Sequence, residues 1–563
     1  MKSLYFILIT GIFTLIIVSG QQTPKLYPQV TIPSGTIRGY YDTATNGKEF
    51  AAFEGIPYAS PPLGKNRFRE PQPVKPWKGT WIANHTVKCL QYDHLLLHTE
   101  NPVHGEEDCL YINVYTPQVN QKAQFDVIVF IHGGCFQFRT SYTNRPHYLL
   151  ENNIVFVTLN YRLGPLGFLS TEDDVVPGNN GLKDQNAALK WVRDNIQYFG
   201  GNPNSVTITG HSAGGASVSY HYLSPMSAGL FHRGIAKSGI ALMPWAQTEG
   251  SLEKAKKLAA SLGCNSESNR EMVECMRYRP GNQIVAKVKL FLYYLYNPFS
   301  PFGPVIEKGG SNPFISESPI EILRQGKVND VPLIISVVRD EGLYPGAEFV
   351  SDPSYLPEIE KKWEELSPYL FDYNYTVPKS EHGLISQKIK AHYLKNQQIS
   401  RATFNELVQA IGDRLFVEPL ELGAKLFAKA LTSPVYFIYF TYRGANSNSI
   451  LLSHSQENLG VCHSDDLIYV LNYAYCQELV NDDKLMKSLI IKNWLTFAKT
   501  GVPIYGSIQP IRVSPSKDLL DYVHIESPKK ISLKTVDTLS HKQFWNSLPF
   551  NENKVSSLTK EEL

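Results

Sequence analysis

The pattern of hydrophobic and polar positions divides much of the chain into strand-like apolar runs and helix-like stretches. Residues 127–131 and 154–159 are continuous apolar runs of the length expected for strands covered on both faces. Residues 181–192 have the apolar spacing of a helix, and a β-branched run at 206–209 follows. Strands that alternate with helices predict an α/β fold, in which helices pack on both faces of a parallel sheet.

The segments on either side of this region have patterns of their own. Residues 26–82 hold short strand-like runs among turn signals, which predict a small N-terminal sheet. Residues 107–115 alternate like a further strand, and the apolar runs at 331–338 and 434–440 add two more. The sequence shows no internal repeat and no low-complexity tract.

The first residues predict entry into the secretory pathway. Lys2 precedes an apolar run from Leu4 to Val18, and small and polar residues follow it. This is typical of a signal peptide, which we place at residues 1–20. An N-terminal membrane anchor is the alternative, but the run is short for a bilayer span, and we expect no later membrane segment.

Secretory entry gives meaning to the sequons and the cysteines. Asn84 and Asn374 begin N-x-T motifs, so we expect N-glycosylation at the surface there. The seven cysteines are then able to form disulfides, and their odd number leaves at least one thiol unpaired within the chain. Two pairs are close in sequence and three cysteines are left over: Cys89 with Cys109, Cys264 with Cys275, and the remaining Cys135, Cys462 and Cys476.

The last four residues resemble a retrieval signal. Lys560-Glu561-Glu562-Leu563 differs from K-D-E-L only at its second position. Together with the signal peptide, this tail predicts retention in the endoplasmic reticulum lumen by a retrieval receptor, with secretion as the alternative.

Charge and motif content limit the classes of function. A formal net charge of +2 over 563 residues favours neither nucleic-acid binding nor a polybasic membrane patch. The sequence holds no metal-ligand cluster and no dinucleotide or phosphate loop, so we expect no metal and no cofactor. We therefore expect no nucleic-acid partner, and a small-molecule substrate is expected from the motifs that follow.

Residues 210–214 spell G-x-S-x-G between a strand-like run and a helix-permissive stretch. In this context the motif predicts a tight turn that exposes Ser212 as a nucleophile at the start of a helix. The amide of Ala213 is then placed to stabilise an oxyanion. The motif alone is weak, but His132-Gly133-Gly134-Cys135-Phe136, directly after the strand at 127–131, suits a loop whose amides face a substrate oxygen.

Taken together, these stretches resemble the type-B carboxylesterase and cholinesterase family. The matching segments are 107–114, 132–136, 160–168 and 178–214, with further matches in the acid and histidine segments. The resemblance implies an α/β-hydrolase fold, with a large, mostly parallel central sheet flanked by helices, a small N-terminal sheet and cap-like insertions. It also implies one domain, residues 21–563, after the signal peptide.

A serine nucleophile needs a histidine base and a carboxylate that orients the histidine. In α/β-hydrolases the acid follows the serine in the chain, and the histidine follows the acid. The strand at 331–338 ends before Asp340 and Glu341, and the residues alone leave the choice between these two acids open. The resemblance selects Glu341 as the acid and His463 as the base. His454 is the nearest rival histidine.

The resemblance assigns further roles. It implies an oxyanion hole made by the amides of Gly134, Cys135 and Ala213, and a hydrogen bond from Ser238 to the acid. It also implies the disulfides Cys89–Cys109 and Cys264–Cys275, which match two loops of the family.

Departures from the family pattern bear on the substrate. His211 precedes the nucleophile where cholinesterases carry glutamate, and Cys135 replaces a glycine that is common in the oxyanion loop. Residues 96–108 contain no tryptophan for a choline cation, which argues against choline esters. Candidates for the substrate pocket, with core packing as the alternative, are His211, Phe299, Phe302 and Tyr344.

The sequence therefore predicts a serine carboxylesterase that hydrolyses apolar carboxylic esters through an acyl-enzyme. Xenobiotic, lipid-derived and volatile signal esters all fit, and the segment around His463 resembles insect carboxylesterases. A narrower alternative is an enzyme like juvenile hormone esterase, although the usual G-Q-S-A-G motif of that enzyme differs here at His211. A non-catalytic binding or adhesion protein is a third hypothesis. The presence of Ser212, Glu341 and His463 argues against it.

Overall fold

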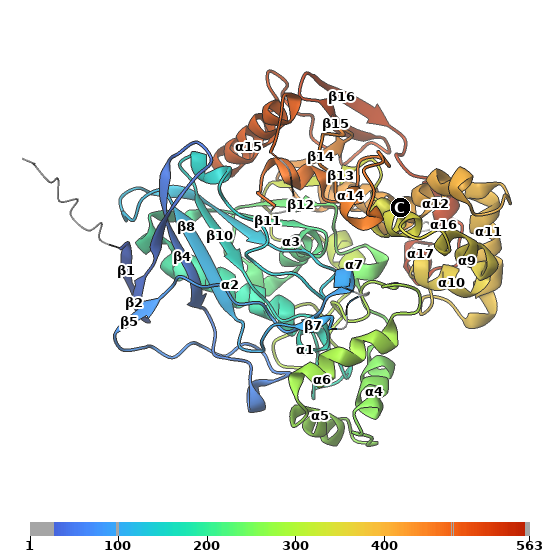
Figure 1. Cartoon of the computed structure of the whole chain (residues 1–563), viewed down its shortest axis with the longest axis horizontal. Helices are drawn as coiled ribbons and strands as arrows, with labels where there is room; N and C mark the ends of the chain where they lie inside the picture. Colours follow the sequence, from blue (N-terminus) through green and yellow to red (C-terminus); the bar gives the residue numbers. More distant parts are fainter. Residues whose placement is uncertain (1–26, 97–98, 100, 474–475, 477, 558–563) are drawn as a thin grey trace, which may run out of the picture.

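The computed structural model describes residues 27–96, 99, 101–473, 476 and 478–557 (Figure 1). An 11-stranded sheet in the order β16-β15-β14-β13-β12-β11-β9-β10-β8-β4-β3 runs through the molecule. Its parallel part consists of β9 (Phe125–Ile131), β10 (Val155–Leu159), β11 (Gly201–His211), β12 (Arg233–Lys237), β13 (Leu333–Val338), β14 (Val435–Phe440) and β15 (Leu520–Ser527).

Antiparallel strands close the sheet at both ends. These are β16 (Lys530–Val536) at one end and β8 (Tyr111–Thr116), β4 (Glu49–Pro57) and β3 (Tyr40–Thr43) at the other. The small N-terminal sheet is present and consists of β1 (Gln29–Ile32), β2 (Gly35–Arg38) and β5 (Thr80–Ile82). The predicted mostly parallel sheet flanked by helices is confirmed.

One predicted strand begins later than its alternating pattern suggested. We expected it to start at Glu107, but β8 starts at Tyr111. Before that point Glu107 pairs with Arg67 and Cys109 is tied to Cys89, so these tertiary contacts hold the segment outside the sheet.

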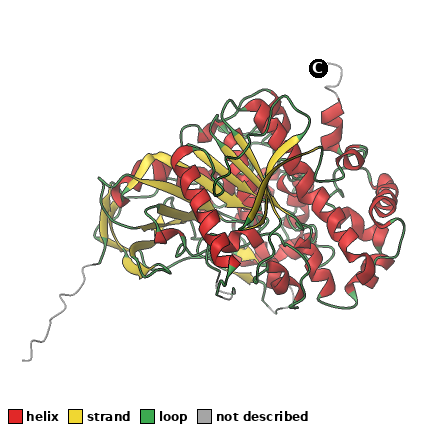
Figure 2. Ribbon diagram, turned by 90° about the horizontal axis from the view of Figure 1, so that it is seen from above, coloured by secondary structure: helices red, strands yellow, loops and turns green. Residues whose placement is uncertain are grey.

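The parallel strands alternate between two hydrophobic cores. In β9, Val127, Val129 and Ile131 face one core, whereas Ile128 and Phe130 face the other. The first core packs against α2 (Asn180–Asn195) and α3 (Ala213–Leu223), and the second packs against α15 (Asp482–Thr500). The sheet is thus covered on both faces, and Figure 2 shows it packed among helices. Burial on both faces explains why its strands read as continuous apolar runs.

Two helical insertions interrupt the alternation of strands and helices. The first lies between β12 and β13 and contains α4 (Ser251–Ser261), α5 (Asn269–Arg277) and α6 (Gly281–Ala286). The second lies between β13 and β14 and contains α9 (Tyr355–Lys361), α10 (Trp363–Leu370), α11 (His382–Leu394), α12 (Phe404–Gly412) and α13 (Glu418–Ala430). Helices α9 to α12 gather beside α16 (Lys542–Asn546) and α17 (Asn551–Ser557) in a helical lobe at the right of Figure 1.

Both predicted disulfides are confirmed. The sulfurs of Cys89 and Cys109 are 2.06 Å apart, and those of Cys264 and Cys275 are 2.07 Å apart. The other three cysteines are free: Cys135, Cys462 and Cys476.

The predictions for the chain ends fall on residues that the structure does not describe. The signal peptide at residues 1–20 and the tail Lys560–Leu563 both lie outside the described residues. No helix among the described residues is long and apolar enough to span a bilayer. Of the two sequons, Asn84 is exposed and Asn374 is half-buried, and their glycosylation stays a prediction.

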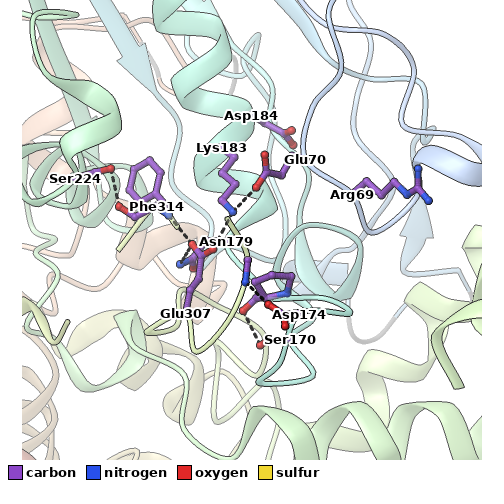
Figure 3. A network of polar contacts seen from close by, with 12 residues as sticks. Arg69, Glu70, Ser170, Asp174, Asn179, Lys183, Asp184, Ser224, Glu307 and Phe314 are labelled. Atoms are coloured by element: carbon purple, nitrogen blue, oxygen red, sulfur yellow. Dashed lines mark hydrogen bonds and ion pairs between the residues drawn. The ribbon is translucent and has the colours of Figure 1, made fainter. Parts of the chain in front are cut away.

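A buried ion-pair network fastens α2 to a loop of the first insertion, after α6 (Figure 3). Lys183 of α2 is buried and its Nζ lies 2.8 Å from Glu307 Oε2 and 2.7 Å from Glu70 Oε1. Glu307 Oε1 accepts hydrogen bonds from the Asn179 amide at 3.0 Å and from the backbone N–H of Phe314 at 2.8 Å. Because Glu307 is fully buried, its charge depends on these partners.

We expect Lys183→Met to lower the free energy of unfolding by about 3–5 kcal/mol, because it leaves the buried Glu307 carboxylate without its cation. The matched control is Lys308→Met, which removes the surface pair with Glu172 and should cost less than about 1 kcal/mol. Urea unfolding measures both. Equal losses would show that burial adds nothing to the Lys183 pair.

Candidate active site

Ser212 lies on a sharp turn between β11 and α3. Its backbone has φ 58° and ψ −125°, which is a strained conformation for a residue with a side chain. Its N–H donates to the carbonyl of Lys237 at 2.8 Å. A Cβ on Gly214 would lie 2.0 Å from the carbonyl oxygen of Ile131, so only glycine fits beside the turn. The turn and its small neighbours thus present the serine hydroxyl at the carboxyl end of the parallel strands.

The glycine-rich loop after β9 lies directly against this serine. A Cβ on Gly133 would lie 3.0 Å from the Cβ of Ser212. Gly134 and Cys135 have φ of 100° and 56°, which turns the chain so that the Gly134 carbonyl accepts from Phe138 N at 3.0 Å. Within the described part of the chain, the amides of Gly134 and Cys135 donate to no protein acceptor. Ala213 begins α3, where amides also lack partners within the helix, so three donors are free for an oxyanion.

The structure places Glu341, rather than Asp340, against His463. Glu341 is fully buried, and its Oε2 lies 2.5 Å from His463 Nδ1 while its Oε1 accepts from Val338 N at 2.9 Å. Asp340 instead accepts from Val461 N at 2.7 Å and pairs with Arg339.

Ser212 and His463 line the same narrow cavity, whose free volume is about 40 Å³. The rival His454 ends α14 (Asn448–Ser453) and is not among the described residues that line the cavity. Other lining residues are Leu95, Phe130, Gly133, Gly134, Phe138, Arg139, Asn144, His211, Tyr344, Leu451, Leu452, Ser464 and Tyr473.

The residues expected to form the substrate pocket take different positions. Tyr344 and His211 line the cavity, but Phe299 and Phe302 do not. Phe299 packs behind Tyr344, with ring centroids 5.4 Å apart, and Phe302 packs against Phe291. Phe299 therefore supports the wall at Tyr344, and Phe302 belongs to the core.

Ser238 is fully buried after β12, beside the serine turn, with φ of 47°. Its hydroxyl has no hydrogen-bond partner among the described residues. The bond that we expected from Ser238 to Glu341 is therefore not formed in this structure.

Cys135 joins the oxyanion loop to the cavity wall. Its Sγ lies 3.2 Å from the Tyr344 hydroxyl, and both side chains are buried. Burial raises the pKa of the Cys135 thiol to about 12, so the sulfur is a neutral thiol at physiological pH. Its role here is packing and a weak hydrogen bond.

Phe416 is a site residue that the sequence did not reveal. Its ring centroid lies 4.8 Å from that of His463 and 6.4 Å from that of Phe299. It belongs to a π-helical turn, Asp413–Val417, between α12 and α13. Such turns are frequent at functional sites, but the local sequence is an ordinary apolar helical pattern and carries no signal of the site.

Comparisons with known proteins agree with this arrangement. The model of the carboxylesterase family matches residues 27–545. The chain is 45% identical to Venom carboxylesterase-6 of Apis mellifera, over 94% of this chain and 96% of that one. It is 42% identical to a carboxylic ester hydrolase of Bombus ignitus, over 94% and 95%.

The solved structure of juvenile hormone esterase from Manduca sexta, with OTFP covalently attached, superposes with a TM-score of 0.80. The two chains are 27% identical, and the match covers 93% of this chain and 99% of that one. The strand order, the serine turn and the relatives together show that this chain belongs to the carboxylesterase family and is a carboxylic ester hydrolase.

Proposed function

We propose that this protein hydrolyses apolar carboxylic esters through an acyl-enzyme on Ser212. The observation that carries the proposal is the strained Ser212, which shares its cavity with a histidine that a buried carboxylate orients. This is the arrangement that activates a serine hydroxyl at neutral pH.

The geometry supports a definite order of proton transfers. Since Nδ1 of His463 faces Glu341, its Nε2 is the nitrogen that takes the Ser212 proton as Oγ attacks the ester carbonyl. The tetrahedral oxyanion then accepts hydrogen bonds from the amides of Gly134, Cys135 and Ala213. His463 returns the proton to the leaving alcohol, and water repeats the sequence on the acyl group.

The size of the cavity supports a preference for short acyl groups. A free volume of about 40 Å³ holds only a few heavy atoms, so longer chains must displace side chains. We expect kcat/KM for p-nitrophenyl esters to fall beyond butyrate, measured from acetate to decanoate. Phe299→Ala should move the optimum to longer chains, because it removes the support behind Tyr344.

The same panel tests the proposed function. Hydrolysis by the wild type together with serine labelling by an organophosphate supports a serine esterase. Absence of both in the folded protein would contradict the proposal. An optimum on long acyl chains in the wild type would contradict only the preference for short chains.

The second candidate is an enzyme with a narrower substrate range, like juvenile hormone esterase. The similarity to the Manduca sexta structure favours it, whereas His211 departs from the motif of that enzyme. Hydrolysis of juvenile hormone without activity on the p-nitrophenyl panel would favour this candidate.

We also propose that the protein acts in the secretory pathway. The two disulfides support an oxidising compartment. Retention through a retrieval receptor for Lys560–Leu563 stays a prediction.

A further inference from the structure

The cavity beside Ser212 is lined by both apolar and polar side chains. Leu95, Phe138, Leu451 and Leu452 are among the apolar ones, and Arg139, Asn144, His211 and Ser464 are among the polar ones. No carboxylate is among the described residues that line the cavity. None of the polar side chains named here is therefore an anionic acceptor.

His211 presents one ring nitrogen that the protein does not satisfy. The residue is 5% exposed, and its Nδ1 lies 3.3 Å from Ser464 Oγ. Burial, together with the neighbouring His463, Lys237 and Arg139, holds the pKa of His211 well below its usual value, so the ring is neutral. When the Ser464 hydroxyl donates to Nδ1, the proton resides on Nε2, and Nε2 has no partner among the described residues.

Asn144 presents a second unsatisfied donor. This residue is 4% exposed, and its Nδ2 makes no hydrogen bond of good geometry in the described part of the chain, although its amide lies near the Tyr473 hydroxyl. A buried donor without an acceptor is costly, and the unfilled space next to both residues is the cavity that they line. A molecule bound in the cavity can therefore supply an acceptor to these donors.

His211 lies beside the histidine that serves the leaving alcohol. The leaving alcohol takes its proton from His463, and the ring centroid of His211 lies 4.4 Å from that of His463. Ser464, the partner of His211, directly follows His463 in the chain. Tyr344 also lies near His463, with ring centroids 5.5 Å apart, and its hydroxyl contacts Cys135 of the oxyanion loop.

We propose that His211 Nε2 and Asn144 Nδ2 form a subsite for an acceptor oxygen in the alcohol part of the substrate. The substrate class is an ester whose alcohol carries a second oxygen function, such as an ether, carbonyl or carboxylate, next to an apolar body. The nearby Arg139 favours electron-rich groups and disfavours cationic ones. The inference rests on the proposed serine esterase function and refines its substrate.

Two isosteric esters provide the test. Butyl acetate and 2-methoxyethyl acetate differ only by a methylene in place of the ether oxygen. Both form the same acetyl-enzyme, so deacylation is common to them and the kcat/KM ratio reports acylation alone. We expect the wild type to prefer 2-methoxyethyl acetate by about three- to ten-fold, as for one net hydrogen bond.

Variants assign the preference to its residues. His211→Phe and Asn144→Leu should each move the ratio towards one, whereas Asn282→Leu on the exposed face of α6 should leave it unchanged. Asn144→Asp replaces a donor by an anionic acceptor and should reverse the preference, with acetylcholine gaining relative to butyl acetate. Because each ratio is taken within one variant, a general loss of activity cancels.

The outcomes distinguish a failure of the proposed subsite from a failure of the proposed esterase function. Equal rates on the two esters in the wild type, or an unchanged ratio in both cavity variants, would overturn the subsite and leave the esterase standing. If His211→Phe does not fold, Asn144→Leu decides alone. No hydrolysis of either ester by the wild type would overturn both proposals.

Discussion

We expect Ser212→Ala to lower kcat for p-nitrophenyl acetate by at least about 10⁴-fold. The substitution removes the only atom of the site that bonds to the acyl group, while the oxyanion amides and the His463–Glu341 pair stay in place. The residual rate then reflects the oxyanion hole and binding alone. Steady-state release of p-nitrophenolate measures the loss.

Ser217→Ala, one turn further along α3, is the matched control. Ser217 is buried, and its hydroxyl bonds to the Ala213 carbonyl rather than lining the cavity. We expect a loss of less than about tenfold, through stability rather than chemistry. A Ser212→Ala enzyme within about a hundredfold of the wild type would contradict Ser212 as nucleophile.

The serine turn and the oxyanion loop were predictable because each is formed by a few contiguous residues with a recognisable motif. Gly214 has to be small because the carbonyl of Ile131 occupies the space of a side chain. The central strands were predictable for a similar reason, since burial on both faces requires unbroken apolar runs. These features depend on local backbone geometry, which a short sequence motif specifies.

The choice between Asp340 and Glu341 could not be made from the residue types and their positions alone. Both acids follow β13, and nothing in the sequence says which side chain turns towards the histidine. That is decided by Val338 N and His463, which hold Glu341, and by Val461 N, which holds Asp340. The resemblance to a family supplied the choice that local chemistry left open.

The walls of the cavity were the least predictable part. Asn144, which lines the cavity, comes from a loop, and Phe416, which packs against His463, comes from a π-helical turn; neither local sequence marks a site residue. Phe299, by contrast, was a candidate for the pocket, but it packs against Tyr344 and does not line the cavity. Which side chains reach a cavity depends on how distant segments pack, and no local pattern encodes it.

The second large effect is expected for Glu341→Gln, with a fall in kcat of about 10⁴-fold and little change in KM. The glutamine keeps the shape of the side chain, but its amide N–H₂ can donate to His463 Nδ1 and so favours the tautomer with the proton on Nε2. An Nε2 that already carries a proton cannot accept one from Ser212. Binding is little affected because Glu341 is fully buried and does not line the cavity.

Asp340→Asn makes the same chemical change one residue earlier in the chain. Its carboxylate holds the backbone at Val461 and pairs with Arg339 near the surface, so we expect less than about a tenfold loss in kcat. Steady-state kinetics of the two variants on p-nitrophenyl acetate decides between the acids. A larger loss for Asp340→Asn than for Glu341→Gln would transfer the orienting role to Asp340. It would also mean that the 2.5 Å contact between His463 and Glu341 is not the one that catalysis uses.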